Sequence, residues 1–185
     1  MSLQLKIIVF VVISAGLAWL SRSSLRGFRF HGFYRFFAWE SLLVLVMLNL
    51  DYWFVEPFSI LQIVSWLLLT VSLFLVIHGF QSLRVVGKPD SKRDDPSLIG
   101  IEKTTELVTV GAYRYIRHPM YSSGLYGAWG VFFKHPSWVS FVLAVITTFF
   151  LTMSAKMEEA ENVRFFGAAY QHYMKRTKMF VPFLF

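Results

Sequence analysis

At 185 residues, the chain is long enough for one domain. It is 56% hydrophobic and only 16% charged, which excludes an ordinary soluble domain because a soluble fold of this size could not bury so much apolar surface. The net charge of +7 does not by itself indicate nucleic acid, since basic residues in membrane proteins report topology. The absence of cysteine excludes a thiolate nucleophile, and the five histidines are scattered, so we expect neither nucleic acid nor a metal as a partner.

Five apolar segments follow one another, and each is a candidate for a membrane-spanning helix, which needs about 20 residues. In chain order they are residues 3–20, 36–55, 58–80, 120–133 and 136–155. Arginines directly after the first segment, and the lack of a clear cleavage site, indicate that it is retained rather than removed as a signal peptide. The fourth segment has only 14 residues, so we expect it to form a tight helical hairpin with the fifth.

The predicted fold class is all-α: a multi-pass membrane protein with about five transmembrane helices and a C-terminal cytoplasmic helix. We expect a single domain over residues 1–185. Its predicted parts are three N-terminal spans in residues 1–80, a cytoplasmic loop in 81–119, a helical hairpin in 120–155 and a cytoplasmic tail helix in 156–185.

The basic residues predict the orientation of the chain. All of the 18 lysines and arginines except Lys6 and Lys134 fall on one side of the five-span arrangement. The positive-inside rule places that side in the cytoplasm, which puts the N-terminus outside and the C-terminus in the cytoplasm. We therefore expect Lys134 to be accessible from outside, and Lys92 only from the cytoplasm.

A polar cluster lies directly before the fourth span. Arg117 and His118 precede Pro119, and proline is tolerated in the first turn of a helix because no amide hydrogen is needed there. The pattern therefore predicts His118 at the N-cap and Tyr121 one turn inside the helix. Arg117 and His118 are either ligands of a bound molecule or anchors at the lipid headgroups, and the glycines that follow permit close approach of a helix or a ligand.

A second cluster follows the last span and contains three acids, Glu158, Glu159 and Glu161. The simpler interpretation is a solvated acidic face in which Glu161 pairs with Arg164. The alternative is a binding site for a cation. Within the spans, Glu40 and His78 are ionisable, and such groups are often functional, although snorkelling or pairing with an arginine explains them at shallow depth.

Together the two clusters resemble a known superfamily. Residues 106–121, ELVTVGAYRYIRHPMY, and residues 158–173, EEAENVRFFGAAYQHY, are similar to the L-V-x-x-G-x-Y-R-x-x-R-H-P-x-Y and E-E-x-x-L-x-x-x-F-G-x-x-Y-x-x-Y segments of isoprenylcysteine carboxyl methyltransferases and phospholipid methyltransferases. Asn162 replaces the leucine of the second segment. The chain also lacks the G-x-G that the animal phosphatidylethanolamine branch uses, which weakens a phospholipid assignment.

The resemblance implies an enzyme that transfers a methyl group from S-adenosylmethionine to a membrane-embedded, lipid-like acceptor, with a prenylcysteine-type carboxylate favoured. It implies catalytic roles for Arg117 and His118. The residues implied in cofactor binding are Val108, Gly111, Tyr113, His118, Tyr121, Glu158 and Glu159. The chemistry agrees, because glutamates can hold the ammonium group of the cofactor and a cationic helix N-terminus can hold its carboxylate.

The same residues are compatible with three other functions. A phospholipid amine N-methyltransferase shares the superfamily, and an NADPH-dependent sterol-type membrane reductase shares a related R-H-P-x-Y segment. In those reductases asparagine usually precedes the tyrosine, where this chain has Met120. A non-catalytic membrane scaffold is a third possibility. The expected partners are membrane lipids and a lipid or prenylated small-molecule or peptide acceptor.

Overall fold

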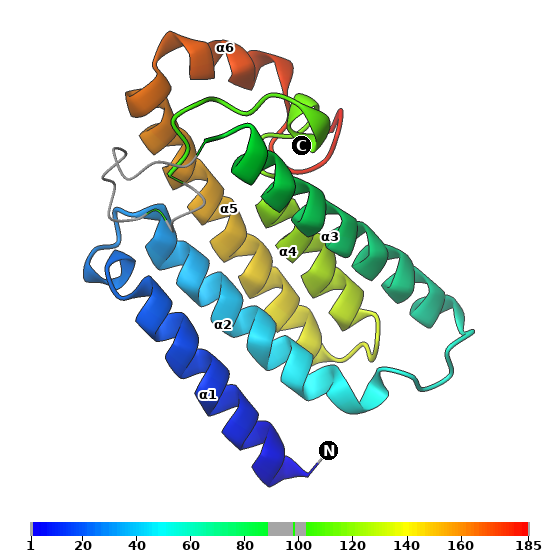
Figure 1. Cartoon of the computed structure of the whole chain (residues 1–185). Coiled ribbons are helices and arrows are strands. Elements are labelled where there is room, and N and C mark those ends of the chain that lie inside the picture. Colours follow the sequence, from blue (N-terminus) through cyan, green and yellow to red (C-terminus); the bar gives the residue numbers. More distant parts are fainter. Residues whose placement is uncertain (1, 89–97, 99–102, 185) are drawn as a thin grey trace.

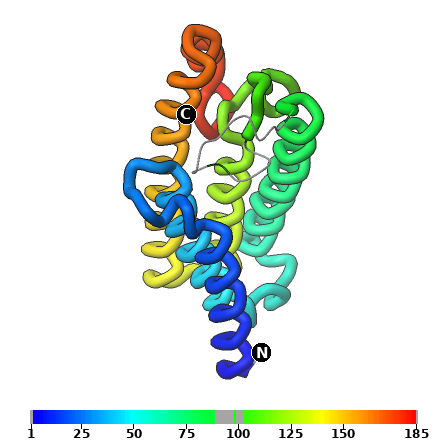
Figure 2. Tube along the Cα trace, turned by 60° about the vertical axis from the view of Figure 1, so that its left-hand side comes forward, coloured from blue at the N-terminus to red at the C-terminus, as the bar shows by residue number. Residues whose placement is uncertain are grey.

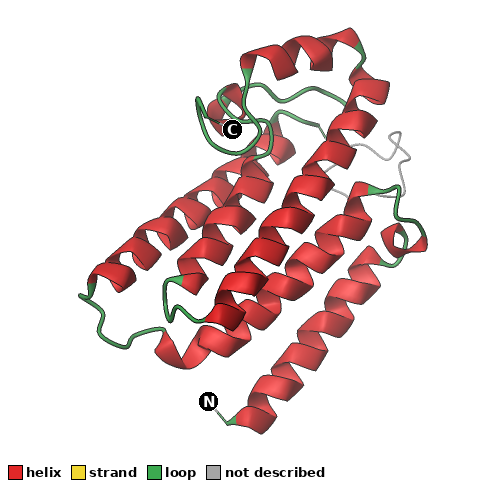
Figure 3. Ribbon diagram, turned by 180° about the vertical axis from the view of Figure 1, so that it is seen from behind, coloured by secondary structure: helices red, strands yellow, loops and turns green. Residues whose placement is uncertain are grey.

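The computed structural model describes residues 2–88, 98 and 103–184. These residues form an all-helical fold without a strand, which confirms the predicted fold class (Figure 3). The main helices are α1 (Leu3–Ser21), α2 (His31–Asn49), α3 (Ile60–Val85), α4 (Pro119–Phe132), α5 (Trp138–Phe166) and α6 (Ala168–Arg176). Lys92, which the predicted orientation places in the cytoplasm, lies outside the described residues.

The first five helices run side by side, and α6 lies across one end of the bundle (Figure 1). The N-terminus lies at the end of the molecule opposite α6 (Figure 2). The closest helix pairs are α2 with α5 and α3 with α4, while α1 contacts α2 at the edge of the bundle. The two termini lie at opposite ends of the bundle, because five helices run along it one after another.

Polar groups and small residues hold each helix pair together. Ser41 Oγ lies 2.9 Å from Thr147 Oγ1 between α2 and α5, and Ser65 Oγ donates to the carbonyl oxygen of Gly130, at 2.7 Å, between α3 and α4. A Cβ atom at Gly130 would lie 2.9 Å from Leu69 Cγ. The small residues of α4 therefore serve close helix packing here, which is how helices associate where lipid provides no hydrophobic driving force.

Four helices are long and apolar enough to cross a membrane: Leu3–Ser21, His31–Tyr52, Ile60–Val85 and Trp138–Phe166. Their large apolar side chains are exposed, for example Phe74 of α3 at 61% and Ile60 at 80%. In a membrane, these side chains would contact lipid tails instead of water, so their exposure on the protein surface costs no free energy. The five predicted segments all form helices, but α4 has only 14 residues, about 21 Å of helix, and is shorter than a bilayer core of about 30 Å.

Several helices differ from their predicted bounds. The predicted tail helix over 156–185 is divided between the end of α5 and α6 (Ala168–Arg176), and residues 177–184 are not helical. α3 continues to Val85 rather than ending at residue 80. α2 begins at His31 rather than residue 36, because a carboxylate oxygen of Glu161 accepts a hydrogen bond from the backbone N–H of His31 at 3.2 Å. α5 does not end near residue 155 but continues to Phe166. It ends at Gly167, whose φ of +60° and ψ of −133° are open to glycine but strained for other residues. The paired glutamates therefore lie on the spanning helix itself.

Lys134 is buried, and the expectation that it is accessible from outside is wrong. Its side-chain Nζ donates to Gln62 Oε1 at 2.9 Å and to the carbonyl oxygen of Trp53 at 3.3 Å, and lies 3.4 Å from the centroid of the Trp66 ring. Burial also lowers the pKa of Lys134. Aromatic rings and two oxygens thus replace water around this ammonium group, which ties the α4–α5 turn to the α2–α3 connection.

The predicted orientation is therefore tested at other positions. Since the chain has no cysteine, a single Phe58→Cys or Gln171→Cys substitution introduces one label site. Phe58 is 89% exposed between α2 and α3, and Gln171 is exposed on α6. We expect a membrane-impermeant maleimide to modify Phe58→Cys in intact cells, and Gln171→Cys only after permeabilisation. Modification of both from the same side would contradict the arrangement of spans, and the reverse pattern would contradict the orientation.

Candidate functional site

A pocket lies at the end of the bundle where α4 begins. The space between its lining atoms is about 610 Å³, a figure that includes open solvent at its mouth. α5 has 29 residues, about 43 Å of helix, and α4 about 21 Å. Because the hairpin joins the two helices at the far end, α5 extends well beyond the start of α4 and leaves room for the pocket.

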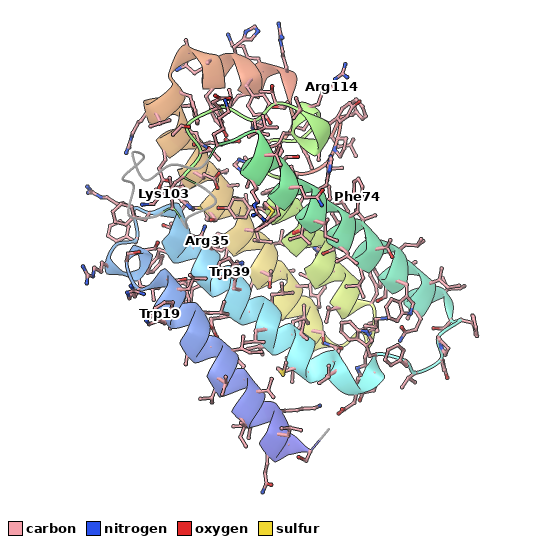
Figure 4. The ribbon with its side chains drawn as sticks, viewed as in Figure 1. Trp19, Arg35, Trp39, Phe74, Lys103 and Arg114 are labelled. Carbon is pink, nitrogen blue, oxygen red and sulfur yellow. The ribbon has the colours of Figure 1, made fainter. Side chains whose placement is uncertain are left out.

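Three parts of the chain line the pocket. α3 and the segment after it contribute Leu83, Thr104, Leu107 and Val108. The 3-10 helix η4 (Gly111–Arg114), the link that follows it and α4 contribute Tyr113, Arg117, His118, Met120 and Tyr121. α5 and α6 contribute Glu158, Asn162, Phe166, Tyr170 and Tyr173. Arg114, which Figure 4 labels, projects outward from η4 and is not part of the lining.

The structure brings most of the sequence-predicted site residues together here. The pocket lining includes six of them: Val108, Tyr113, Arg117, His118, Tyr121 and Glu158. Glu159 is buried behind the lining, in contact with Arg117 and His118. Gly111 is not in the lining. Its φ is +61°, and a Cβ atom there would lie 2.5 Å from His78 Nε2, so this glycine serves a tight turn against α3.

The start of α4 is formed as the sequence predicts. His118 is the N-cap residue and Pro119 occupies the first turn, where its missing N–H has no consequence. The hydroxyl oxygen of Ser122, one turn further, lies within hydrogen-bond distance of two carbonyl oxygens, those of His118 at 2.9 Å and Phe180 at 3.0 Å, and donates to one of them. The N-terminus of α4 is thus fixed beside the pocket, with the positive end of its helix dipole at that side.

Arg117 is the centre of an ionic cluster at the wall of the pocket. Its Nε donates to Glu159 Oε1 at 2.6 Å, and His118 Nε2 lies 3.3 Å from the same oxygen. Arg117 Nη1 also donates to the carbonyl oxygens of Met174, at 3.3 Å, and Thr177. One guanidinium therefore joins α5, the end of α6 and the segment that follows it, and its charge is already paired with a carboxylate.

The C-terminal segment, which the sequence interpretation missed, lies along residues 115–118. Arg117 N donates to the Lys178 carbonyl oxygen at 2.7 Å, and His118 N donates to that of Met179 at 3.2 Å. Phe180 is 1% exposed and packs in a core cluster with Tyr121. The apolar sequence MFVPFLF, which follows the basic residues Lys175, Arg176 and Lys178, was the available signal that part of this segment is buried, although Phe183 and Leu184 at its end are exposed.

Aromatic side chains form much of the pocket wall. The Tyr173 hydroxyl donates to the carbonyl oxygen of Tyr113 at 2.6 Å. Burial raises the pKa of Tyr173, and burial together with the negative charge of Glu158 raises the pKa of Tyr170. Both phenols are therefore neutral at physiological pH, and their ring faces can attract a cation within about 6 Å.

The three acids of α5 have three different environments. Glu159 pairs with Arg117, and Glu161 pairs with His31 Nδ1 at 2.5 Å rather than with Arg164. Glu158 lines the pocket and has no ion-pair partner within the described part of the chain. The charge of Glu158 is thus the one that a positively charged ligand in the pocket would meet.

The two ionisable residues within the spans are not part of the pocket. Glu40 accepts a hydrogen bond from Ser14 Oγ at 2.7 Å, between α1 and α2. His78 stacks on Phe74 with 5.5 Å between ring centroids and lies against Gly111. Both have structural neighbours that explain their positions.

The cluster around Arg117 predicts a large effect on stability. Arg117→Ala leaves Glu159 buried without its cation, which should lower the free energy of unfolding by about 3 kcal/mol, and it should expose residues 177–184 to proteases. Thermal unfolding and limited proteolysis of the cofactor-free protein measure both effects. Arg114→Ala, which removes an exposed arginine of η4, is the control. A stability of Arg117→Ala equal to that of the control would contradict the structural role.

Known proteins are similar to this chain. A methanethiol S-methyltransferase of Pseudomonas deceptionensis is 29% identical over 120 residues, which cover 65% of this chain and 43% of that protein. That of Crocosphaera subtropica is 28% identical over 123 residues, 65% of this chain and 44% of that protein. A protein-S-isoprenylcysteine O-methyltransferase of Schizosaccharomyces pombe is 34% identical over 79 residues, 42% of this chain and 34% of that protein.

The matched part of the chain thus spans less than half the length of these relatives. No solved structure is significantly similar. A family model described as phospholipid methyltransferase matches residues 60–169, from the start of α3 into α6, and this range includes most of the pocket lining. This family match and the four long apolar helices together indicate an integral membrane protein. Because the match covers more than half of the chain, the protein belongs to the phospholipid methyltransferase family, in the superfamily that also includes isoprenylcysteine methyltransferases.

Proposed function

We propose that the protein is a methyltransferase that binds S-adenosylmethionine in the pocket at the start of α4 and methylates an apolar, membrane-embedded acceptor. The observation that carries this proposal is Glu158, an acid without an ion-pair partner in the described residues that faces a pocket with four tyrosines. The family match and the names of the relatives support methyl transfer independently.

The residues of the pocket fit the chemical groups of the cofactor. Glu158 would hold the ammonium by a charge-assisted hydrogen bond, and the rings of Tyr121 and Tyr170 would face its positive charges. The N-terminus of α4 suits the carboxylate, since helix N-termini attract anions. Val108 and Tyr113 provide an apolar wall for adenine. When bound, the cofactor supplies a methyl group on a sulfonium that is already an activated leaving group.

Arg117 and His118 act at the reacting end of the pocket in this proposal, but in different ways. Since the guanidinium of Arg117 is engaged with Glu159 and with two backbone carbonyls, we propose that it positions His118 and the C-terminal segment. His118 is 4% exposed and its ring stacks on Tyr121, with 5.5 Å between centroids. It would orient the acceptor beside the methyl group, because alignment is the main contribution that such a reaction needs.

Cofactor binding tests this proposal directly. We expect calorimetric titration of the purified protein to detect S-adenosylhomocysteine but not NADPH. Glu158→Gln removes one charge-assisted hydrogen bond, worth about 1.5–3 kcal/mol, and should weaken the binding of S-adenosylhomocysteine roughly ten- to hundredfold without lowering the thermal stability of the cofactor-free protein. Glu106→Gln is the matched control, since Glu106 is an exposed acid paired with Lys88 at the same end of the molecule. Equal affinity in all variants, or binding of NADPH instead, would refute the proposal.

The proposed acceptor is an ionised nucleophile on an apolar body. His118 is the one histidine among the described residues that line the pocket, and its Nε2 already lies 3.3 Å from Glu159 Oε1. We therefore see no side chain that is free to remove a proton from the acceptor. A carboxylate with a pKa of about 4 needs none, whereas an ammonium with a pKa of about 10 must first lose a proton. We therefore propose a prenylcysteine-type carboxylate. A small thiol is the second candidate, favoured by the two relatives whose alignments cover the larger share of this chain.

The dependence of rate on pH distinguishes these acceptors. With a farnesylated cysteine derivative that has a free carboxylate, the rate should be nearly flat from about pH 6 to 9 at saturating cofactor. With an alkyl thiol it should rise about tenfold per pH unit below the thiol pKa of about 8.5. Mass spectrometry of the products identifies the methylated atom. N-methylation of phosphatidylethanolamine with a steeply rising rate, and no product from the other two, would restore the phospholipid-amine alternative.

A further inference from the structure

A histidine of α2 is bound to the acidic part of α5 through both its backbone and its side chain. His31 is 0% exposed. Its backbone N–H donates to Glu161 Oε1 at 3.2 Å, and its ring Nδ1 lies 2.5 Å from Glu161 Oε2. α2 lies outside residues 60–169, which the family model matches. The contact therefore joins a helix outside the family match to a helix that lines the pocket.

The rotation of α5 about its axis is fixed by two ionic contacts. Successive residues of an α-helix are about 100° apart around the axis. Seen from Glu158, Glu159 therefore points roughly 100° to one side and Glu161 roughly 60° to the other. Glu159 is held by Arg117 and Glu161 by His31. The three α5 residues of the pocket lining, Glu158, Asn162 and Phe166, point between these two acids. Each contact therefore restricts the direction in which Glu158 can point.

His31 also reaches a tyrosine of the pocket through α5. Ser154 Oγ donates to the backbone carbonyl oxygen of His31 at 2.9 Å and lies 3.2 Å from the Tyr121 hydroxyl. Because a serine hydroxyl has one hydrogen, and the carbonyl receives it, the Tyr121 hydroxyl is the donor to Ser154. The same α2 residue thus contacts groups that set the positions of Glu158 and of Tyr121.

The other ring nitrogen of His31 fits this arrangement. Arg35 Nη1, one turn further along α2, lies 3.4 Å from His31 Nε2, and Arg35 is 1% exposed. A guanidinium only donates, so Nε2 accepts, and Nδ1 is left to donate to Glu161. Figure 4 labels Arg35 on α2 in the half nearer to α6.

We propose that His31 is a positioning residue of the cofactor site, which holds Glu158 and Tyr121 in the direction that the amino-acid part of the cofactor requires. This inference rests on the proposed function, in which Glu158 holds the cofactor ammonium. It makes α2, which the family match does not include, a functional part of the site. A contact that only held α2 to α5 would affect every ligand of the pocket alike, whereas a positioning role affects the ligands that use Glu158.

Two ligands that differ only in the amino-acid part separate these roles. S-adenosylhomocysteine has the ammonium group, and methylthioadenosine lacks it while keeping the adenosine and sulfur. With the full chain in lipid nanodiscs, His31→Ala should weaken the binding of S-adenosylhomocysteine about tenfold, because part of the charge-assisted hydrogen bond to Glu158 is lost. The affinity for methylthioadenosine should change less than about twofold. His31→Asn places an amide N–H close to the position of Nδ1 and should restore most of the affinity.

The matched control is Ser41→Ala, which removes another buried hydrogen bond between α2 and α5, to Thr147, at a distance in sequence from the acids. It should leave the ratio of the two affinities unchanged. The inference is overturned if His31→Ala weakens both ligands equally, or if Ser41→Ala changes the ratio as much. If His31→Ala does not fold, Glu161→Gln gives the same comparison, with the same expected direction. If the wild-type protein binds neither ligand, the proposed function itself fails, and this inference with it.

Discussion

The ion pair between Arg117 and Glu159 determines how the end of the bundle is built. Both side chains are 11% exposed, and charges removed from water this far are tolerated only when they are paired and hydrogen-bonded. Arg117 also donates to the carbonyl oxygens of Met174 and Thr177. The direction of α6 and the path of the C-terminal segment follow from this cluster, and so does the availability of Glu158, because the strongest cation nearby is already engaged.

The acidic run of α5 shows why a local pattern did not reveal its own roles. Glu158, Glu159 and Glu161 are near neighbours in sequence, yet they point in three directions because a helix turns about 100° per residue. The partner of Glu159 is 42 residues away and that of Glu161 is 130 residues away. The sequence therefore predicted an acidic cluster beside the membrane. Which partner each glutamate has depended on contacts with residues distant in sequence.

Much of the fold was predictable because apolar runs of sufficient length have few alternatives to a helix in lipid. The predictions that failed involved contacts distant in sequence. The early start of α2 depends on Glu161, and the burial of Lys134 depends on Trp66 and Gln62. For the pocket, the resemblance located six of its lining residues, but not the contribution of residues 177–180, which have no polar motif, nor the role of Gly111 as a turn against His78.

The unequal lengths of α4 and α5 explain where chemistry can occur. α4 has 14 residues, about 21 Å of helix, and is too short to cross a bilayer core of about 30 Å, whereas α5 has 29 residues, about 43 Å. The polar residues at the start of α4 therefore lie beside α5 rather than beyond its end, where Glu159 can pair with Arg117 and Glu158 can line the pocket. Under the proposed function, this position beside the spanning helices would let a charged cofactor enter the partly open pocket from water and an apolar acceptor approach it from lipid.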